Sequence, residues 1–262
     1  GNVVDYRVFV ERAHQNDVKV AVAADLMSLA LLTPPGEWGA DCVIGSSQRF
    51  GVPMGFGGPH AAFFATREDY KRHIPGRIVG VSTDRHGKKG FRLALQTREQ
   101  HIRRDKATSN ICTAQALLAV MASMYAVYHG PNGIKIIADD IHRKTCKLAK
   151  ALKDLGYSIA NEVYFDTLDV ILPEGVTKVN IEEIATEYKI NLHFHYTNQV
   201  GISLDETVSR KDFDDLVEIF NRAIGREDVI DIPDSFDSPI KDFFKRESAY
   251  LEHPVFNSFH SE

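Results

Sequence analysis

One glycine-rich stretch brings together residue types that could hold a ligand closely. Residues 45–60 read Gly-Ser-Ser-Gln-Arg-Phe-Gly-Val-Pro-Met-Gly-Phe-Gly-Gly-Pro-His, between two short apolar runs at 41–44 and 61–65 that are typical of buried strands. Glycine lets a backbone approach a ligand or adopt positive φ, and proline fixes its own φ. Ligands of open α/β sheets bind beyond the carboxyl ends of the strands. The pattern predicts an ordered binding loop, and a plain strand connection is the alternative.

A basic segment precedes a predicted helix start and could contact phosphate. Hydroxyl side chains at a helix N-terminus are natural phosphate ligands, and arginine adds bidentate contacts. Thr108 and Ser109 are the hydroxyl candidates, and a solvated face with ordinary helix caps is the alternative. The basic residues are Arg92, Arg98, His101, Arg103, Arg104 and Lys106.

Two other groups of residues give little support for a functional site. His193 and His195 alternate along a predicted strand and so share a face, but no third ligand stands at a telling spacing, and we predict no metal site. Ser46 or Ser47 with His60 could form a nucleophile and base, but the sequence has no GxSxG turn and no acid to orient them.

The chain up to about residue 130 alternates strand and helix signals, as βαβ layers do. We predict strands at 19–25, 39–44, 61–66 and 77–81, helices at 6–15, 26–32 and 70–74, and a polar hairpin tip at 84–90. A long helix is predicted from Thr108 to the break at Gly130-Pro131, followed by a second helix from about 133 to 155.

The rest of the chain predicts a small antiparallel α+β unit followed by a tail. Strands are expected at 164–172, 191–196 and 201–204, with helices at 181–188 and 211–224. The tail, 226–262, is rich in aromatic residues, so we expect it to lie across another surface, with a flexible linker as the alternative.

Several runs resemble one known family. The stretch Ser-Gln-Arg-Phe-Gly-Val-Pro-Met-Gly-Phe-Gly-Gly-Pro-His-Ala-Ala-Phe-Phe at 47–64 and the runs at 92–115, 201–207 and 253–262 are similar to the amino-terminal half of glycine dehydrogenase (decarboxylating), the P-protein of the glycine cleavage system. The resemblance covers essentially the whole chain. It implies two related halves with the fold of type I pyridoxal-phosphate enzymes, and a cofactor lysine only in the carboxy-terminal half.

The resemblance implies that this chain lacks the lysine. The corresponding loop of the active half reads approximately His-Lys-Thr-Phe-Cys-Ile-Pro-His-Gly-Gly-Gly-Gly-Pro-Gly, and an ungapped overlay puts its lysine on Gln48. An amide cannot condense with an aldehyde as an amine does. We therefore predict no catalytic residue in this chain and no pyridoxal 5'-phosphate bound covalently to it.

The resemblance also suggests roles for three further residues. Asp25 ends a predicted strand where type I enzymes place the carboxylate that pairs with the cofactor's pyridine nitrogen, although the active half's Asp-Gly-Ala-Asn run is replaced by Ala-Asp-Leu-Met at 24–27. A strand-end or helix-capping role is the alternative for Asp25. Thr108 and Ser109 would occupy a place from which type I enzymes reach the partner's cofactor phosphate.

The expected fold is α/β: an incomplete, mostly parallel large domain of the type I fold at 1–130, a small α+β domain at 131–225, and a tail at 226–262 that packs on the missing half. By resemblance, the whole enzyme decarboxylates glycine and passes the aminomethyl group to the lipoyl H-protein. We expect this chain to be its silent half, giving scaffold and interface to the active carboxy-terminal half.

Two rival readings stay open. In one, the chain is active alone and uses Lys88 or Lys89 for the cofactor, although a polar hairpin tip would leave these amines protonated. In the other, the chain is a non-enzymatic docking module for the lipoyl carrier, which the aromatic tail and the basic segment would suit.

Composition sets the remaining bounds. With 262 residues, 44% of them hydrophobic, and a net charge of −5, the chain reads as a soluble globular protein without nucleic acid or membrane as its main partner. Cys42, Cys112 and Cys146 read as reduced core thiols of an intracellular protein, cytoplasmic in a bacterium or in the mitochondrial matrix of a eukaryote. Because the chain opens with Gly1 rather than Met, we expect a fragment of a longer polypeptide.

Overall fold

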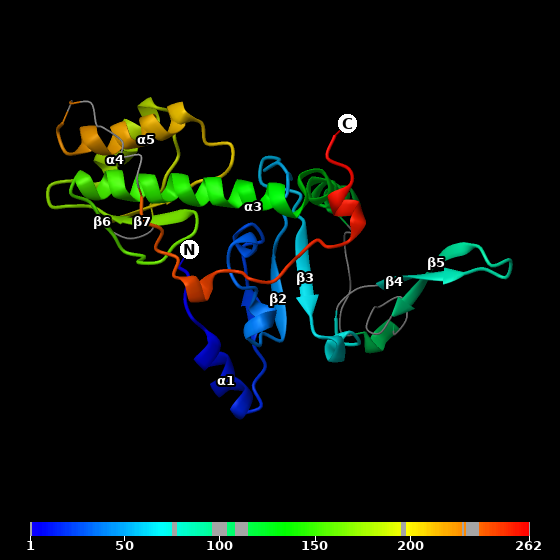
Figure 1. Ribbon diagram of the computed structural model, residues 1–262. Helices are drawn as coiled ribbons and strands as arrows, with labels where there is room; N and C mark the ends of the chain where they lie inside the picture. The colour runs from blue at the N-terminus through cyan, green and yellow to red at the C-terminus, as the bar shows by residue number, and fades with distance from the viewer. Residues whose placement is uncertain are drawn as a thin grey trace. The chain divides into compact units, whose positions relative to one another are not determined.

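The computed structural model describes residues 2–74, 78–95, 104–107, 115–194, 198–226, 228 and 236–261. The chain forms two compact units (Figure 1). The first, here called the α+β unit, comprises residues 1–8, 27–34 and 126–262. The second, called the sheet unit, comprises residues 9–26 and 35–125. None of the described helices is long and apolar enough to cross a membrane.

The α+β unit is built on a four-stranded sheet in the order β6-β7-β9-β8. Its strands are β6 (Ser158–Ile159), β7 (Thr167–Ile171), β8 (His193–Phe194) and β9 (Gln199–Ser203), and every neighbouring pair is antiparallel. Helices α4 (Lys178–Glu187) and α5 (Arg210–Ala223) and the later part of α3 (Ala116–Asp154) complete the unit. The predicted antiparallel α+β arrangement is confirmed, with the short β6 as an added strand.

The core of this unit follows from the period-two pattern of its strands and the apolar stripes of its helices. Leu168 and Val170 on β7, Val200 on β9 and Phe220 on α5 are fully buried. Tyr157 stands edge-on to the Phe220 ring at 5.1 Å and donates its hydroxyl proton to the Phe220 carbonyl at 2.8 Å. Each large apolar side chain buried in this way contributes about 1.5–3 kcal/mol to folding.

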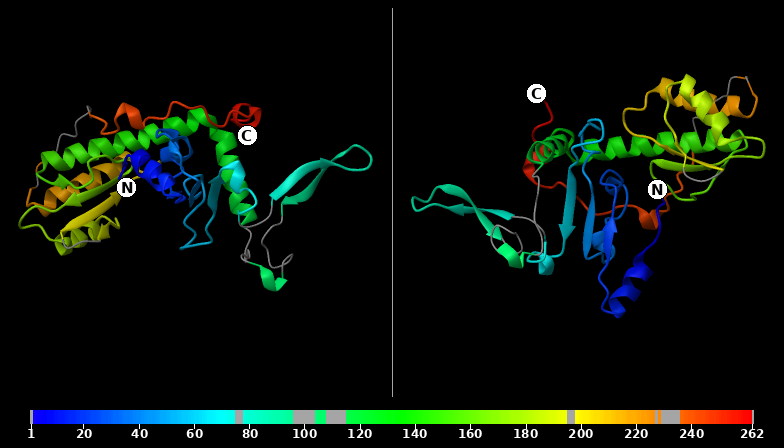
Figure 2. Two further views of the ribbon diagram at one scale, coloured as in Figure 1. Left: turned by 90° about the horizontal axis from the view of Figure 1, so that it is seen from below. Right: turned by 180° about the vertical axis from the view of Figure 1, so that it is seen from behind.

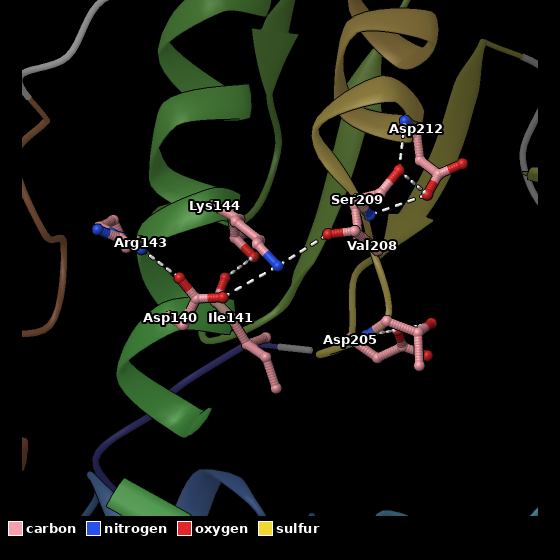
Figure 3. A network of polar contacts seen from close by, with 10 residues as sticks. Asp140, Ile141, Arg143, Lys144, Asp205, Val208, Ser209 and Asp212 are labelled. Carbon is pink, nitrogen blue, oxygen red and sulfur yellow. Dashed lines mark hydrogen bonds and ion pairs between the residues drawn. The ribbon is translucent and has the colours of Figure 1, made fainter. Parts of the chain in front are cut away.

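Polar contacts fix the start of α5 (Figure 3). Ser209 and Asp212 form a capping box, in which each side chain accepts from the other residue's backbone N–H. Lys144 on α3 donates to the Val208 carbonyl at 2.8 Å and pairs with Asp140 at 2.9 Å. The helix therefore begins at a defined residue and is held to α3.

Helix α3 is interrupted where the sequence predicts a break. Gly130 has φ 61°, outside the helical region, and Pro131 follows it. A Cβ on Gly130 would lie 2.6 Å from the Phe256 carbonyl oxygen, so both the backbone angle and the close tail require glycine here.

Much of the tail packs on its own chain. Ile240 is buried, Thr33 donates its backbone N–H to the Phe244 carbonyl at 2.8 Å, and Arg246 donates to the Leu29 carbonyl at 2.8 Å. Tyr250 donates its hydroxyl proton to the Pro131 carbonyl at 2.8 Å. The described part of the tail is therefore not a loose linker. It belongs to the α+β unit. Its packing on a missing half stays a prediction.

The sheet unit contains three paired strands in the order β1-β2-β3. β1 (Ala21–Ala23) lies parallel to β2 (Cys42–Ser46), and β3 (Ala62–Thr66) lies antiparallel to β2. The expectation of a mostly parallel sheet is wrong for these strands. A parallel crossover usually needs a helix, whereas β2 and β3 are joined by the glycine-rich loop, which returns the chain antiparallel.

One face of this sheet is open. Ala23, Ile44 and Phe64 lie side by side in the register, and Ile44 and Phe64 are 44% and 47% exposed. Ala21 and Ala62, on the same face, are exposed as well. We call these five residues the open sheet face.

A buried carboxylate ties α1 (Arg7–Gln15) to the sheet. Asp41 is 4% exposed, accepts the Val20 backbone N–H at 2.9 Å and contacts His14 Nε2 at 2.8 Å. Burial by itself would raise the pKa of Asp41, but the hydrogen bonds from Val20 and His14 outweigh it and lower the pKa below its usual value.

The predicted hairpin is confirmed as β4 (Ile78–Thr83) and β5 (Lys89–Leu95). Among the described strands, these two pair only with each other (Figure 2).

Two predicted helices are shorter than expected. The 26–32 stretch holds only a 3-10 turn at Ser28–Ala30, and the 70–74 stretch is replaced by a 3-10 turn at Glu68–Tyr70. Prolines at 34 and 35 leave the first of these too little length for an α-helix.

Candidate functional site

The candidate site lies where β1 and β2 end. Because these strands are parallel, their carboxyl ends meet at one edge of the sheet. Ala24 extends the pairing through its N–H to the Ile44 carbonyl at 2.9 Å, and Asp25 follows it. The glycine-rich loop leaves β2 at the same edge.

Gln48 sits in the first turn of that loop. Its backbone N–H donates to Ser46 Oγ at 3.2 Å, and its carbonyl accepts the Val52 N–H at 3.1 Å. The side chain is half-buried and ends in an amide, which is neither a nucleophile nor a base at neutral pH.

Arg49 directs its guanidinium toward Asp25. Arg49 Nε lies 3.9 Å from Asp25 Oδ1, and the two side chains are 24% and 32% exposed. This ion pair was not foreseen from the sequence. A cation directly after Gln48 and an acid at the end of a parallel neighbouring strand were the signal that could have predicted it.

Aromatic packing fixes the next residues of the loop. The Phe50 ring stacks on Tyr125 of α3, with centroids 5.4 Å apart and planes at 29°. Gly51 has φ 74°, and a Cβ there would lie only 2.8 Å from Tyr125 Cδ2. Bulkier residues at position 51 would therefore push the loop off α3.

The tip of the loop is open. Met54 is 79% exposed and Phe56 fully so, between Gly55 and Gly57, which both have positive φ. The loop is thus anchored at its base by Phe50 and Val52 and presents apolar side chains at its tip.

Comparison with known proteins identifies the family. A model described as the glycine cleavage system P-protein matches residues 1–220. The chain belongs to this family. It is 58% identical to the glycine dehydrogenase (decarboxylating) of Nostoc sp. over 100% of this chain and 27% of that protein. The chain therefore spans about 27% of the length of such P-protein relatives.

Solved structures agree on the fold. A crystal structure of glycine decarboxylase (P-protein) of the glycine cleavage system, in inhibitor-bound form, matches with a TM-score of 0.74 and 33% identity, over 84% of this chain and 51% of that one. A NifS-like protein matches with a TM-score of 0.57 at 14% identity, over 86% and 58% of the two chains, and shows the α/β fold alone.

The described residues of this P-protein segment do not fit a covalently held pyridoxal phosphate. At the edge where β1 and β2 end, position 48 offers an amide and position 49 a guanidinium, which stays protonated in proteins. The carboxylate of Asp25, the candidate partner for a ring nitrogen, already has a cation beside it. Lys88 and Lys89 are exposed on the β4–β5 hairpin.

The other candidates are only partly described. Thr108 and Ser109 lie outside the described residues, as do Arg98, His101, Arg103, His195 and Cys112. Arg92, Arg104 and Lys106 are exposed. Among the described residues, no group of three or more His, Cys, Asp or Glu side chains could hold a metal ion.

Sequence reasoning missed one buried polar cluster in the α+β unit. His142 Nδ1 lies 2.9 Å from the Phe165 carbonyl, which can only accept, so this nitrogen carries the proton and Nε2 accepts from Ser238 Oγ at 2.7 Å. Cys146 Sγ lies 3.5 Å from His142 Nε2. Burial raises the pKa of Cys146 to about 12 and lowers that of His142, so the thiol stays protonated. Cys146 is a free, buried thiol, as predicted.

Proposed function

We propose that this chain is the lysine-less, catalytically silent half of a pyridoxal-phosphate-dependent glycine decarboxylase. The whole enzyme would decarboxylate glycine and transfer the aminomethyl group to the lipoyl H-protein. When bound in the active half, the cofactor supplies the electron sink for that reaction. This chain would contribute scaffold and interface.

The proposal depends on two features found together: an amide at position 48, and the ion pair between Arg49 and Asp25. Gln48 offers no amine for a covalent link, and the guanidinium compensates the Asp25 charge without any cofactor. The acid at the end of β1 thus has a cation 3.9 Å away, which supports a site that does not hold a cationic ring.

Reductive trapping tests this directly. The purified chain is incubated with pyridoxal phosphate, reduced with borohydride, digested and mapped by mass spectrometry. We expect no lysine labelled stoichiometrically. Gln48→Lys combined with Arg49→Thr serves as the matched control, because it restores an amine and removes the competing cation. Stoichiometric labelling of one lysine in the unaltered chain, such as Lys88 or Lys89, would establish the self-sufficient rival instead.

A phosphate contact from Thr108 or Ser109 to the partner's cofactor belongs to the same proposal. In the complete enzyme, Thr108→Ala should weaken cofactor affinity by about 1.5–3 kcal/mol, the worth of one hydrogen bond to a charged group. Fluorescence titration of the cofactor measures this. Unchanged cofactor affinity in both Thr108→Ala and Ser109→Ala would contradict the proposed phosphate contact.

A docking module for the lipoyl carrier is the alternative function. The tail supports this alternative only weakly, because Phe244, Arg246 and Tyr250 form hydrogen bonds within the chain itself. Binding of the H-protein to this chain alone, measured by calorimetry, would favour the docking module. Scaffold function predicts little binding without the active half.

A further inference from the structure

Ser238, in the tail, borders a pocket of the α+β unit. The pocket has a volume of about 740 Å³ and is lined by residues 30–31, the later part of α3 and the described part of the tail. Ser238 is exposed, and Pro239 after it favours an extended backbone at the serine. A pocket of this volume can hold a small organic ligand, and such a ligand would lie beside Ser238.

A buried imidazole accepts the proton of this serine hydroxyl. His142 Nδ1 donates to the Phe165 carbonyl at 2.9 Å, which leaves Nε2 to accept from Ser238 Oγ at 2.7 Å. His142 is 6% exposed, and its ring stacks on the Phe165 ring with centroids 6.3 Å apart. The chain itself therefore fixes both the tautomer and the orientation of the imidazole.

The hydroxyl oxygen of Ser238 keeps one lone pair for a reaction. A serine hydroxyl has one proton and two lone pairs. The proton is directed to His142, and one lone pair accepts the Ile240 backbone N–H at 3.2 Å. A hydroxyl within hydrogen-bond reach of a base that a third group orients is the arrangement of an activated nucleophile.

The charged side chains of the pocket favour an anion. Four cations line it against two acids: Lys135, Arg143, Lys245 and Arg246 against Asp139 and Asp140. Arg143 pairs with Asp140, and Lys245 has an acidic partner as well (Figure 3). Lys135 and Arg246, however, form no ion pair among the described residues. An excess of positive charge raises the local concentration of anions.

The same pocket has apolar walls. They are formed by Leu31, Ile136, Phe236 and Ile240. The lining therefore suits a reagent with an anionic end and a small apolar end. An acyl phosphate has both, because its phosphate is the leaving group and its acyl group is apolar.

We propose that Ser238 is a nucleophile, with His142 as its general base, and that it takes an acyl group from a small acyl phosphate. Ser238 Oγ attacks the acyl carbon while its proton passes to His142 Nε2. The bond between the acyl carbon and the phosphate oxygen then breaks, and the departing phosphate takes the proton from Nε2. The products are an acyl ester on Ser238 and inorganic phosphate. This chemistry is separate from glycine decarboxylation and does not rest on the proposed function.

The surroundings of His142 suit the role of a base. Burial lowers the pKa of His142, so the imidazole is neutral and able to accept a proton at neutral pH. Asp139 and Asp166 act in the opposite direction and stabilise the imidazolium once it has formed. Burial raises the pKa of the neighbouring Cys146 and Tyr164, which therefore stay protonated and add no charge.

The test uses the complete P-protein that contains this chain. It is incubated with acetyl phosphate, and acetylated residues are mapped and timed by mass spectrometry. Ser238 should be acetylated about 100-fold faster than Ser158, an exposed serine on β6 that serves as the matched control, because general-base assistance gives at least this factor. Equal rates at the two serines, or no acetylation of Ser238, would overturn the inference.

The pH dependence supplies a readout that needs no variant. The rate at Ser238 should rise with pH through the pKa of His142, which lies below its usual 6.5, and should level off at neutral pH. An unassisted hydroxyl has no such plateau, so a rate at Ser238 that keeps rising contradicts the role of His142 as base.

His142→Gln should slow acetylation of Ser238 about 100-fold and leave Ser158 unchanged, with circular dichroism checking the fold. An unchanged rate at Ser238 in this variant also overturns the inference. None of these outcomes bears on the silent-half function, which is tested separately by trapping with pyridoxal phosphate.

Discussion

The two units differ in how much of their apolar surface they bury. In the α+β unit, strand β7 buries alternate side chains, and Leu168, Val200 and Phe220 are fully inaccessible. In the sheet unit, the corresponding central strand β2 buries Val43 but leaves Ile44 44% exposed on the open sheet face. Both regions are sheets with helices nearby, yet only one has a closed core.

The difference indicates two sources of stability. The α+β unit is stabilised by burial, which scales with area removed from water. The sheet unit relies more on directed polar contacts such as those of Asp41.

Truncation in the closed core should have the largest effect. Leu168→Ala should lower the free energy of unfolding by about 2–5 kcal/mol, because the cavity adds to the lost transfer energy. The matched truncation Ile44→Ala on the open sheet face should cost less than about 1 kcal/mol. Urea unfolding measures both. Similar losses would mean that Ile44 is buried in solution and that the contrast is wrong.

Loss of the Asp41 charge should destabilise the sheet unit. Asp41→Asn should cost about 1.5–3 kcal/mol at pH 7, since a charged acceptor is removed from buried donors. The folded pKa lies below the ordinary 3.8, so the stabilisation is full above that pH and is lost as the pH falls through the folded pKa. The gap between variant and parent in urea midpoint should therefore narrow as the pH falls below 3.8.

The control for this charge is Asp242→Asn, whose side chain is 94% exposed. The urea midpoint of Asp242→Asn should equal that of the parent both at pH 7 and below pH 3.8. Hydrogen exchange should place the Asp41→Asn effect on α1 and β1. An effect spread equally over β7 and β9 would count against separate sources of stability in the two units.

Removal of the α5 cap should have a smaller effect. Ser209→Ala should cost about 0.5–2 kcal/mol, the usual worth of an N-cap hydroxyl. Ser158→Ala, at an exposed position on β6, is the control and should be neutral. Thermal unfolding followed by circular dichroism measures both. A cost as large as that of Leu168→Ala would show that capping rather than burial stabilises the α+β unit.

The exposed ion pair between Arg222 and Glu187 should contribute least. The pair measures 2.8 Å, but both side chains are at least 36% exposed, so water and salt screen it. Glu187→Gln should leave the urea midpoint unchanged in low and high salt alike. A lower urea midpoint in low salt but not in high salt would show that surface charge, as well as burial, stabilises the α+β unit.

Local signals predicted the elements well where one residue type decides the conformation. Gly130-Pro131 predicted the helix break, the polar residues at 84–90 predicted the hairpin, and the alternation at 164–172 predicted β7. These features depend on backbone freedom and side-chain period, which the sequence displays directly.

Features that depend on neighbours distant in the chain were missed. The antiparallel return of β3 depends on the path of the loop, and β6 is too short to show a period. In the site, the resemblance predicts Gln48 at the place of the lysine, which stays a prediction. The approach of Arg49 to Asp25 was missed because it depends on the pairing of β1 with β2. Contacts between His142 and Ser238 join residues too far apart for any local pattern.

The arrangement of the two units along the chain has a consequence for biosynthesis. Most of the sheet unit, 35–125, is translated before the α+β unit, whose segments include residues 126–262. Domains generally fold as they emerge, at about 5–20 residues per second. The strands of the sheet unit therefore leave the ribosome before residues 126–262, with Ile44 and Phe64 uncovered, which makes this stretch a natural client for nascent-chain chaperones.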